Sequence, residues 1–500
     1  MSHEIEYNLE RCQERSIRDH GRERECDDDD ENVVGWQKKK MGERSRHEWK
    51  KMWEIAGPAI LASVSQFSIG FVTSAFVGHL GDLELAAVSL VQNVIEGFVY
   101  GFMLGMGSAL ETLSGQAVGA GRFNMLGIYL QRSFIVTGCT ALCLTPVYVF
   151  ASPLLKLFRQ NNEISELAGK YSVMIIPQLF AYAINFPIQK FLQSQNKVWV
   201  LTMISMSALA FHALLNWILI TKLNQGLVGA AIAGNVSWWL MVSAQIIYVT
   251  SGWFPAAWTG FSSLAFKSLA SFVKLSLASA VMLCLELWNY TAIILMVGWL
   301  TNPKIAVDAI SISMNLQLWT LMIALGFNVS ISVRVSNELG AGNPEAAKFS
   351  IVVAVLTSAG IGVLFTAVAL ATKNQLPKLF TGQPKVIKAT SKLGYFLAAT
   401  IFLNSIQPVL HGVAVGVGWQ FTVALINILS YYLIGLPISA LLGYKFKLGV
   451  QGIWSGLLIG CLIQTIVLLV LMLRTNWHKE ALQAEDRVRT LGGDTGSTQM

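Results

Sequence analysis

A single carboxylate stands in one of the most apolar stretches of the chain. Glu286 lies in the run from Leu277 to Tyr290, and no basic residue occurs between Lys274 and Lys304. Burying a charge at the centre of a membrane costs about 2.5 to 3.5 kcal/mol on insertion scales, and desolvation favours the neutral form of a carboxylic acid. Such a side chain can bind and release a proton. We therefore favour a proton-coupling role for Glu286 over a structural hydrogen bond.

Two pairs of polar residues recur at helical spacing in other apolar runs. Asn404 and His411 are seven residues apart, about two turns along one helix face. A histidine can change charge near neutral pH, and a neutral, hydrogen-bonded His411 fits the sequence equally well. Asn427 and Tyr431 are an i, i+4 pair that either lines a cavity or satisfies itself. We group Asn404 and His411 with Glu286 as proton-coupling candidates.

The elements that must position these residues are apolar helices. Hydrophobic residues make up 54% of the chain and charged residues only 13%, against roughly 25% charged in soluble proteins. Uncharged runs of about 20 residues recur, each long enough to span a bilayer as a helix. We predict an all-α membrane protein with twelve spans, six per half. Their centres lie near Phe67, Phe98, Thr137, Leu179, Leu209, Trp238, Leu285, Thr320, Gly360, Phe402, Leu429 and Cys461.

The sequence also repeats itself. Residues 105–122 return loosely as 326–343, at an offset of 221 (326 − 105 = 221), and Pro187 returns as Pro408 at the same offset. Two copies that run in the same direction in an apolar chain indicate a transporter with two pseudo-symmetric halves.

The two copies share their pattern of spans but differ in their titratable residues. Gln66 takes the place of Glu286, and Lys190 takes the place of His411. The titratable carboxylate is thus present in the second copy alone. We expect the proton chemistry to lie in the C-terminal half.

Domain boundaries follow from the charge distribution. We predict a disordered cytosolic tail over 1–50, an N-terminal six-helix lobe over 51–251 and a linker over 252–267. A C-terminal six-helix lobe over 268–474 and a cytosolic tail over 475–500 complete the chain.

Basic residues before the first span place the N-terminus in the cytosol, and an even number of spans returns the C-terminus there. The lysine-rich loop after the ninth span, residues 373–392, conflicts with this orientation. Arg334 and Glu338, another i, i+4 pair, then fall at the cytosolic rim. We expect a structural ion pair there, with a gate as the alternative role.

Signals for enzymatic chemistry are absent from the sequence. It contains no nucleotide-binding P-loop sequence, and its six cysteines show no spacing typical of a metal site. We expect a protein that is not an enzyme, with no metal or other cofactor and no nucleic-acid partner. Its partners are expected to be protons, a small organic solute and the lipid bilayer, and we expect a monomer.

Five segments carry a resemblance to plant members of the multidrug and toxic compound extrusion (MATE) family, the DETOXIFICATION proteins. The resemblance covers nearly everything from Glu54 to Trp477. The segments are L-E-T-L-S-G-Q-A-V-G-A-G at 110–121, F-P-I-Q-K-F-L-Q-S-Q at 186–195, K-L-S-L-A-S-A-V-M-L-C-L-E at 274–286, I-S-V-R-V-S-N-E-L-G-A-G-N at 331–343 and L-N-S-I-Q-P-V-L-H-G-V-A-V-G-V-G-W-Q at 403–420.

The resemblance implies a proton-driven antiporter whose two lobes enclose a central V-shaped cleft. The family's seventh-helix glutamate falls on Glu286. Its tenth-helix partner is often an aspartate, but here it is Asn404. The resemblance therefore implies proton handling by Glu286 alone, with Asn404 as its hydrogen-bond partner.

The pattern L-N-S-I-Q-P-V-L resembles the subgroup associated with loading flavonoids into vacuoles, which usually has Ser at the position of His411. The short connection at 119–124 argues against the citrate exporters. These features imply the vacuolar membrane, with the plasma membrane as the alternative.

We expect the two lobes to rock about the cleft to give alternating access. Planar polyphenol glycosides would suit a site of aromatic rings and amides. The alternatives are a passive chloride or anion channel and an antiporter for organic cations such as alkaloids. The residues expected to bind the solute are Trp288, Asn289, Tyr290, Trp319, Asn427 and Tyr431.

Overall fold

The computed structural model describes residues 23–158, 160–300 and 303–492. These residues fall into two compact units, 1–51 and 52–500. The first unit is helical from Glu23 onward, and the part of the predicted disordered tail at 1–22 lies outside the described residues.

Helices make up the N-terminal half, and short π-helical turns (η1, η2) interrupt two of them. The elements are α2 (Glu23–Val77), α3 (Asp82–Leu90), η1 (Val91–Glu96), α4 (Gly97–Gly119), α5 (Asn124–Val149), α6 (Ala151–Leu157), α7 (Asn162–Met174), α8 (Ile176–Ser194), α9 (Val198–Asn216), η2 (Trp217–Lys222) and α10 (Gly226–Thr250).

The C-terminal half repeats this plan and adds a final helix. Its elements are η3 (Ser263–Phe266), α11 (Leu269–Gly298), α12 (Pro303–Gly340), α13 (Pro344–Thr372), η4 (Leu376–Leu379), α14 (Pro384–Val417), α15 (Gln420–Asn427), η5 (Ile428–Gly435), α16 (Leu436–Ala440), η6 (Leu441–Lys445), α17 (Gly449–Arg474) and α18 (Trp477–Gly492). Of these, η3 and η4 are 3₁₀ turns, and η5 and η6 are π-helical.

The described part of the chain supplies eleven helices long and apolar enough to cross a membrane. A twelfth span is the pair α7 and α8, which is bent by 52° and contains the expected fourth centre near Leu179. Pro177 lies in the first turn of α8. Proline is tolerated at a helix start but cannot continue a preceding helix, so it marks the position of the bend. The prediction of an all-helical fold is confirmed.

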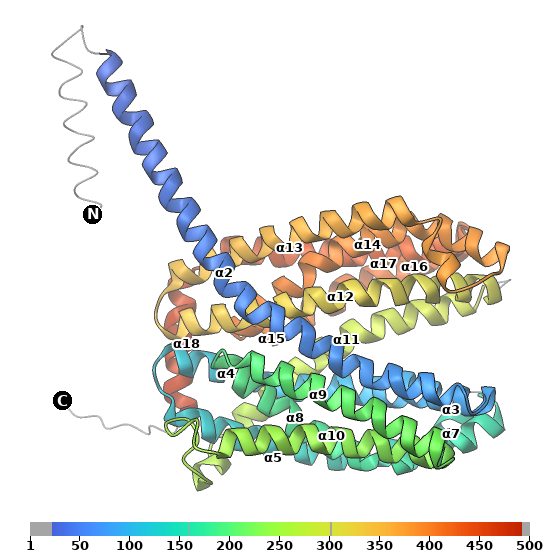
Figure 1. Ribbon diagram of the computed structural model, residues 1–500. Helices are drawn as coiled ribbons and strands as arrows, with labels where there is room; N and C mark the ends of the chain where they lie inside the picture. Colours follow the sequence, from blue (N-terminus) through green and yellow to red (C-terminus); the bar gives the residue numbers. More distant parts are fainter. Residues whose placement is uncertain (1–22, 159, 301–302, 493–500) are drawn as a thin grey trace. The chain divides into compact units, whose positions relative to one another are not determined.

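Within the second unit, the two halves form two groups of helices that lie side by side. Figure 1 shows α3 to α10, in blue to green, on one side and α11 to α17, in yellow to red, on the other. One hydrophobic core, from Ile69 to Val242, lies wholly in the first half, and another, from Ile293 to Leu457, lies wholly in the second. Each half therefore has a core of its own.

The halves meet where α4 packs against α11, α12 and α14. Small residues allow this close approach. A Cβ atom added at Gly105 would overlap the Cα of Ala280, and one added at Gly101 would overlap the side chain of Leu287. Glycine allows helix backbones in lipid to come close together. This seam, α4 against α11, joins the N-terminal lobe to the helix that carries Glu286.

One end of the seam is also closed by hydrogen bonds. The Thr112 hydroxyl of α4 donates to the Val415 carbonyl of α14 at 2.5 Å. One turn further along, Gln116 Nε2 donates to the Gly416 carbonyl at 3.1 Å. These bonds hold the C-terminal ends of α4 and α14 together across the two lobes.

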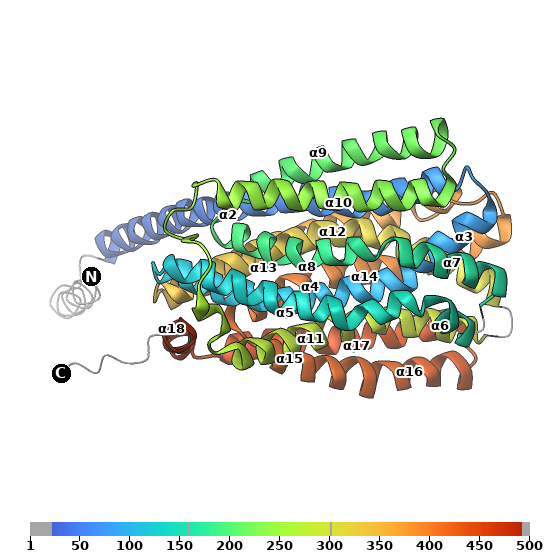
Figure 2. The ribbon, with the colours of Figure 1, turned by 90° about the horizontal axis from the view of Figure 1, so that it is seen from below.

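The last helix, α18, packs at this end against α4, α12 and α13. Figure 2 shows it at the same end of the bundle as the connection between α10 and α11. Arg487 Nη1 donates to the Val417 carbonyl at 2.5 Å, and Trp419 Nε1 donates to Glu480 at 3.3 Å. Burial lowers the pKa of the Arg487 guanidinium below its ordinary value, an effect that Glu480 partly offsets. The helix thus contacts both lobes.

Candidate functional site

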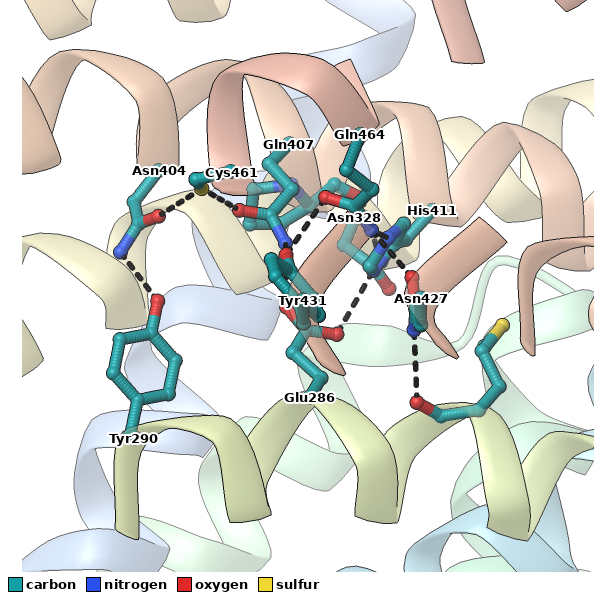
Figure 3. Close-up of polar contacts among 12 residues, drawn as sticks. Glu286, Tyr290, Asn328, Asn404, Gln407, His411, Asn427, Tyr431, Cys461 and Gln464 are labelled. Carbon is teal, nitrogen blue, oxygen red and sulfur yellow. Dashed lines mark hydrogen bonds and ion pairs between the residues drawn. The ribbon is translucent and has the colours of Figure 1, made fainter. Parts of the chain in front are cut away.

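Glu286 lies on α11 and faces α14. His411 Nδ1 lies 3.0 Å from Glu286 Oε2, and Gln407 Nε2 donates to Glu286 Oε1 at 3.1 Å. The Glu286 side chain is 18% exposed, while His411 is 4% exposed. Each oxygen of this carboxylate therefore has one hydrogen-bond partner on α14 (Figure 3).

The two α14 residues belong to a closed ring of side chains. Gln407 Nε2 also donates to the Tyr431 hydroxyl at 2.5 Å, and Tyr431 donates to Gln464 Oε1 at 2.7 Å. Gln464 Nε2 lies 2.7 Å from His411 Nε2, which closes the ring. We call the set Glu286, His411, Gln464, Tyr431 and Gln407 the C-lobe ring. It joins α11, α14, η5 and α17.

Two branches tie the C-lobe ring to its surroundings. In the first, Gln464 Nε2 donates to Asn427 Oδ1 at 2.7 Å, and Asn427 Nδ2 donates to the Met282 carbonyl of α11 at 3.1 Å. In the second, the Cys461 thiol donates to Gln407 Oε1 at 2.9 Å. Buried polar groups with complete partners stabilise one arrangement of the site.

The local sequence explains why α14 can supply so many partners. Asn404, Gln407 and His411 are spaced i, i+3 and i+7, so they share one face of the helix. Pro408 lies within this stretch, and its carbonyl accepts a hydrogen bond from Asn328 of α12 at 2.7 Å. A proline inside a helix removes the backbone donor to the carbonyl four residues earlier, and the Asn328 contact is a separate bond between α12 and α14.

Asn404, expected to hydrogen-bond to Glu286, has other partners in the structure. Its Nδ2 donates to the Tyr290 hydroxyl at 2.9 Å, and the Cys461 thiol lies 3.7 Å from its Oδ1. The amide that contacts Glu286 is Gln407, one turn further along the same face. Asn404 also borders a void of about 10 Å³ between α12, α13 and α14, about the size needed for one water molecule.

The residues expected to bind the solute fall into different places. Asn427 and Tyr431 are buried and share Gln464 as a partner, and Asn289 is also buried. Trp288 is half exposed and stacks on Phe98 of α4 with ring centroids 5.8 Å apart. Trp319 is half exposed beside Phe67 of α2, with centroids 6.4 Å apart. Both tryptophans thus contact the other lobe.

Sequence reasoning missed Gln407, Gln464 and Cys461. The spacing of Gln407 between Asn404 and His411 was a signal for it. Gln464 and Cys461 are three residues apart in an otherwise apolar span, which also places them on one helix face. An isolated glutamine in such a span needs a buried partner. That signal was present in the sequence, but the partner could not be identified without the fold.

A cavity of about 500 Å³, which we call the N-lobe cavity, lies mainly in the N-terminal lobe. Residues of α12 in the C-terminal lobe complete its wall. Seven carboxamide side chains and six aromatic rings line it: Gln66, Gln92, Asn93, Gln178, Gln189, Gln193 and Asn328, and Phe67, Phe71, Tyr100, Tyr171, Tyr182 and Trp238.

Two charged residues of opposite sign also line this cavity. Glu96, in the π-helical turn η1, accepts a hydrogen bond from Gln178 at 2.9 Å. Lys190 forms a buried ion pair with Glu111 of α4, with Nζ 2.6 Å from Oε2. Among the described residues, no cationic side chain pairs with Glu96. The two lobes thus have different chemistry: a fixed ion pair at Lys190 and a histidine–carboxylate contact at His411.

The predicted rim pair forms on α12. Arg334 Nη2 lies 2.7 Å from Glu338 Oε1, and both side chains are largely buried. The pair is about two turns from the end of α12 at Gly340, near the hydrogen-bonded end of the seam. It therefore lies away from the C-lobe ring.

The sequence profile of the MatE family matches the chain twice, over residues 58–218 and 278–441, more than half of its length. The chain belongs to the MATE family of membrane transporters. The matched segments begin 220 residues apart (278 − 58 = 220), in agreement with the internal repeat. The resemblance inferred from the sequence is confirmed.

Relatives and solved structures agree with this assignment. Protein DETOXIFICATION 33 of Arabidopsis thaliana is 54% identical over 91% of this chain and 93% of its own length, and Protein DETOXIFICATION 29 is 53% identical over 89% of both. The crystal structure of the eukaryotic MATE transporter AtDTX14 superposes with a TM-score of 0.85 at 31% identity, covering 89% of this chain and 99% of that one. The Vibrio cholerae MATE transporter VcmN in its bent form, at 20% identity, has a TM-score of 0.75 and covers 89% and 99%.

The MATE fold accounts for the architecture described above. It explains the two lobes, the repeat and the twelve spans, and it identifies the protein as an integral, multi-pass membrane transporter. The C-lobe ring and the N-lobe cavity are features of this chain's own side chains.

Proposed function

We propose that this MATE protein is an antiporter that exchanges protons at Glu286 for an organic solute. The observation that carries the proposal is the setting of Glu286 in the C-lobe ring. It is the single carboxylate of the ring, and both of its oxygens accept hydrogen bonds from α14. Intramembrane carboxylates in such settings mark proton relays and ion pathways.

Protonation of Glu286 has a mechanical consequence. A carboxylate accepts from both donors, His411 Nδ1–H and Gln407 Nε2–H. A proton on either oxygen turns that oxygen into a donor, which then faces another donor. One of the two bonds from Glu286 to α14 is lost, which weakens the contact between α11 and α14.

This change can reach the other lobe through the seam. The helix α11 carries Glu286 on one face and packs on α4 through Ala280 and Gly105 on another. Packed helices with two discrete arrangements transmit such local changes. We infer that loading and unloading of the proton shifts the lobes between the two access states.

The N-lobe cavity supports a planar, polyhydroxylated aromatic solute such as a flavonoid glycoside. Its volume of about 500 Å³ falls within the range of small-molecule sites. Aromatic rings such as Tyr182 and Trp238, whose centroids are 4.6 Å apart, offer faces for ring stacking. The carboxamides both donate and accept hydrogen bonds, which suits sugar and phenol hydroxyl groups.

We place the transporter in the vacuolar membrane with both termini in the cytosol, and the plasma membrane is the alternative. An acidic vacuolar lumen would supply the proton that reloads Glu286. The solute would then move from cytosol to lumen against the outward flow of protons.

Uptake into acid-loaded proteoliposomes tests the proposal. The wild-type protein should take up a flavonoid glycoside only with a pH gradient, and Glu286→Gln should abolish that uptake because glutamine cannot exchange a proton. Glu345→Gln, which neutralises an exposed carboxylate, is the matched control and should transport normally. Full gradient-driven uptake by Glu286→Gln would overturn the proposal.

The same vesicles separate the alternative functions. A current carried by chloride alone, without a pH gradient, would indicate an anion channel. Preference for an alkaloid over the glycoside would indicate an organic-cation antiporter, which the unpaired carboxylate of Glu96 in the cavity favours.

A further inference from the structure

We propose that Gln464 is a positioning residue that fixes the tautomer of His411, so that Nδ1–H points at Glu286. This inference rests on the proposed proton coupling at Glu286. It assigns a role in that reaction to a residue of the twelfth span that touches neither proton nor solute. Hydrogen-bond polarity fixes this tautomer along one branch of the ring, from the Met282 carbonyl to the Glu286 carboxylate.

The branch begins at the Met282 carbonyl, one turn before Glu286 on α11. A carbonyl oxygen only accepts hydrogen bonds. The Asn427 side chain must therefore turn its NH₂ group toward it, as the 3.1 Å contact from Nδ2 shows. The Oδ1 of Asn427 is then directed away from α11, and it faces α17.

The next member, Gln464, is held in a single orientation. Its Nε2 donates to Asn427 Oδ1 at 2.7 Å, and its Oε1 accepts from Tyr431 at 2.7 Å. A flipped amide would place its oxygen against Asn427 Oδ1, two acceptors in contact. The second hydrogen of Nε2 therefore points at His411 Nε2, 2.7 Å away.

His411 must accept that hydrogen at Nε2. Its own proton is then on Nδ1, 3.0 Å from Glu286 Oε2, where it donates to the carboxylate. A doubly protonated imidazole would direct Nε2–H at the N–H of Gln464, donor against donor. The intact ring therefore accommodates His411 as a neutral donor, and an arriving proton binds to Glu286.

No other charged group in the cluster changes this polarity. The titratable neighbours are Tyr290 on α11, Tyr431 on η5 and Cys461 on α17, all neutral in their ordinary forms. From α12, Asn328 donates to the Pro408 carbonyl and Gln317 hydrogen-bonds to Tyr290, and both are neutral amides. Gln464 thus sets the tautomer of His411, and Glu286 accepts the hydrogen bond from Nδ1–H.

Histidine-selective ¹⁵N labelling with solid-state NMR in lipid tests the tautomer directly. The chain has only seven histidines, and the signal lost in His411→Asn identifies the ring of interest. The wild type should show the Nδ1–H tautomer at neutral to alkaline pH. Gln464→Leu should lose this preference, and Gln464→Glu, which presents acceptors to Nε2, should convert His411 to imidazolium.

The pH profile of uptake supplies the second readout. In Gln464→Glu the pH of half-maximal uptake should move downward by about 1 to 3 units, because the imidazolium formed at His411, 3.0 Å from Glu286, favours the charged form of that carboxylate. Gln245→Glu, at a buried glutamine of α10 in the other lobe, is the matched control and should leave the profile in place. If Gln464 had only a structural role, Gln464→Glu would lower transport without moving the pH profile of uptake.

The two proposals fail separately. A wild-type His411 in the Nε2–H tautomer would overturn the role of Gln464, whatever Glu286→Gln does. Gradient-driven uptake by Glu286→Gln would overturn the proton site even with the tautomer as expected.

Discussion

At the scale of single residues, the two lobes treat buried charge in opposite ways. In the C-terminal lobe, Glu286 contacts His411 and Gln407, neither of which carries a permanent charge. In the N-terminal lobe, the position equivalent to His411 is Lys190, which is locked to Glu111 at 2.6 Å with both side chains less than a tenth exposed. A lysine opposite a carboxylate forms an ion pair in which each side chain supplies the other's partner. The contact of Glu286 with His411 suits a switch. The Lys190–Glu111 pair suits a structural tie between α8 and α4.

The Lys190–Glu111 pair should therefore affect stability more than coupling. Lys190→Met leaves Glu111 buried without its partner, which typically costs about 3 to 5 kcal/mol, and a marked fall in melting temperature is expected in detergent. The double variant Lys190→Met/Glu111→Leu should recover most of the loss. The exposed pair Lys156–Glu166, 2.8 Å apart, is the control, and Lys156→Met should cost less than about 1 kcal/mol. Equal losses at the two sites would contradict this.

The site could be predicted from the sequence in part. A lone carboxylate in an apolar span pointed to Glu286, and helical spacing pointed to the face of α14 that contacts it. The partner of the carboxylate was not predictable, because Asn404 and Gln407 share that face and only the rotation of α14 against α11 selects between them. The roles expected of Asn404 and His411 in proton coupling stay predictions.

At the scale of elements, π-helical turns distinguish the two copies of the repeat. Gly226 returns as Gly449, at an offset of 223 (449 − 226 = 223). At this offset η2 falls on residues 440–445, which overlap η6. No such partner exists for η1 or η5, whose equivalents lie inside the regular helices α12 and α9. The unmatched turns carry Glu96 and Tyr431. A π turn inserts one residue and re-aims the side chains beside it, and here it does so beside the cavity and within the ring.

The close approach of α4 and α11 should tolerate no side chain at Gly105. Alanine favours a helix over glycine by about 1 kcal/mol, yet its Cβ at 105 would overlap the Ala280 backbone. Gly105→Ala should lower both melting temperature and uptake because it forces the seam apart. Gly138→Ala on α5, where no atom lies within 4 Å of the added Cβ, should be neutral or stabilising. Unchanged transport by Gly105→Ala would show that this contact does not link the lobes.

The elements themselves were largely predictable, and their irregularities were not. Uninterrupted apolar runs predict the spans because a bilayer leaves no alternative to a helix. The bend between α7 and α8 lies near Pro177, a visible signal. The π turns have no comparable signal, since the residues of η5 would fit a regular helix equally well.

At the scale of the whole molecule, the large cavity and the C-lobe ring occupy different lobes. The cavity draws nearly all of its wall from the N-terminal lobe, and the C-lobe ring lies entirely in the other. The contact between them runs through α4, α11 and α12. Under the proposed function, changes in one lobe should alter solute affinity and changes in the other should alter the response to pH.

Substitution of Trp238 tests this division. Trp238→Ala removes an aromatic wall of the cavity that contacts Tyr182. Loss of an aromatic contact of about 0.5 to 1.5 kcal/mol should raise the KM for the glycoside about two- to tenfold while the pH profile of uptake stays in place. Trp238→Phe should retain most of the affinity, and Trp199→Ala, at an exposed position, should change neither. A shifted pH profile in Trp238→Ala would contradict the division between lobes.

The presence of a single carboxylate in the C-lobe ring also sets the energetics of a pump. Exchange of one proton per cycle yields 1.36 kcal/mol for each unit of pH difference, which is a tenfold gradient of solute. When the solute is neutral, each cycle also moves one net charge and gains about 2.3 kcal/mol per 100 mV of membrane potential. Under the proposed function, an asparagine at position 404 in place of a second acid thus limits how far the solute can be concentrated, because only one proton per cycle supplies free energy.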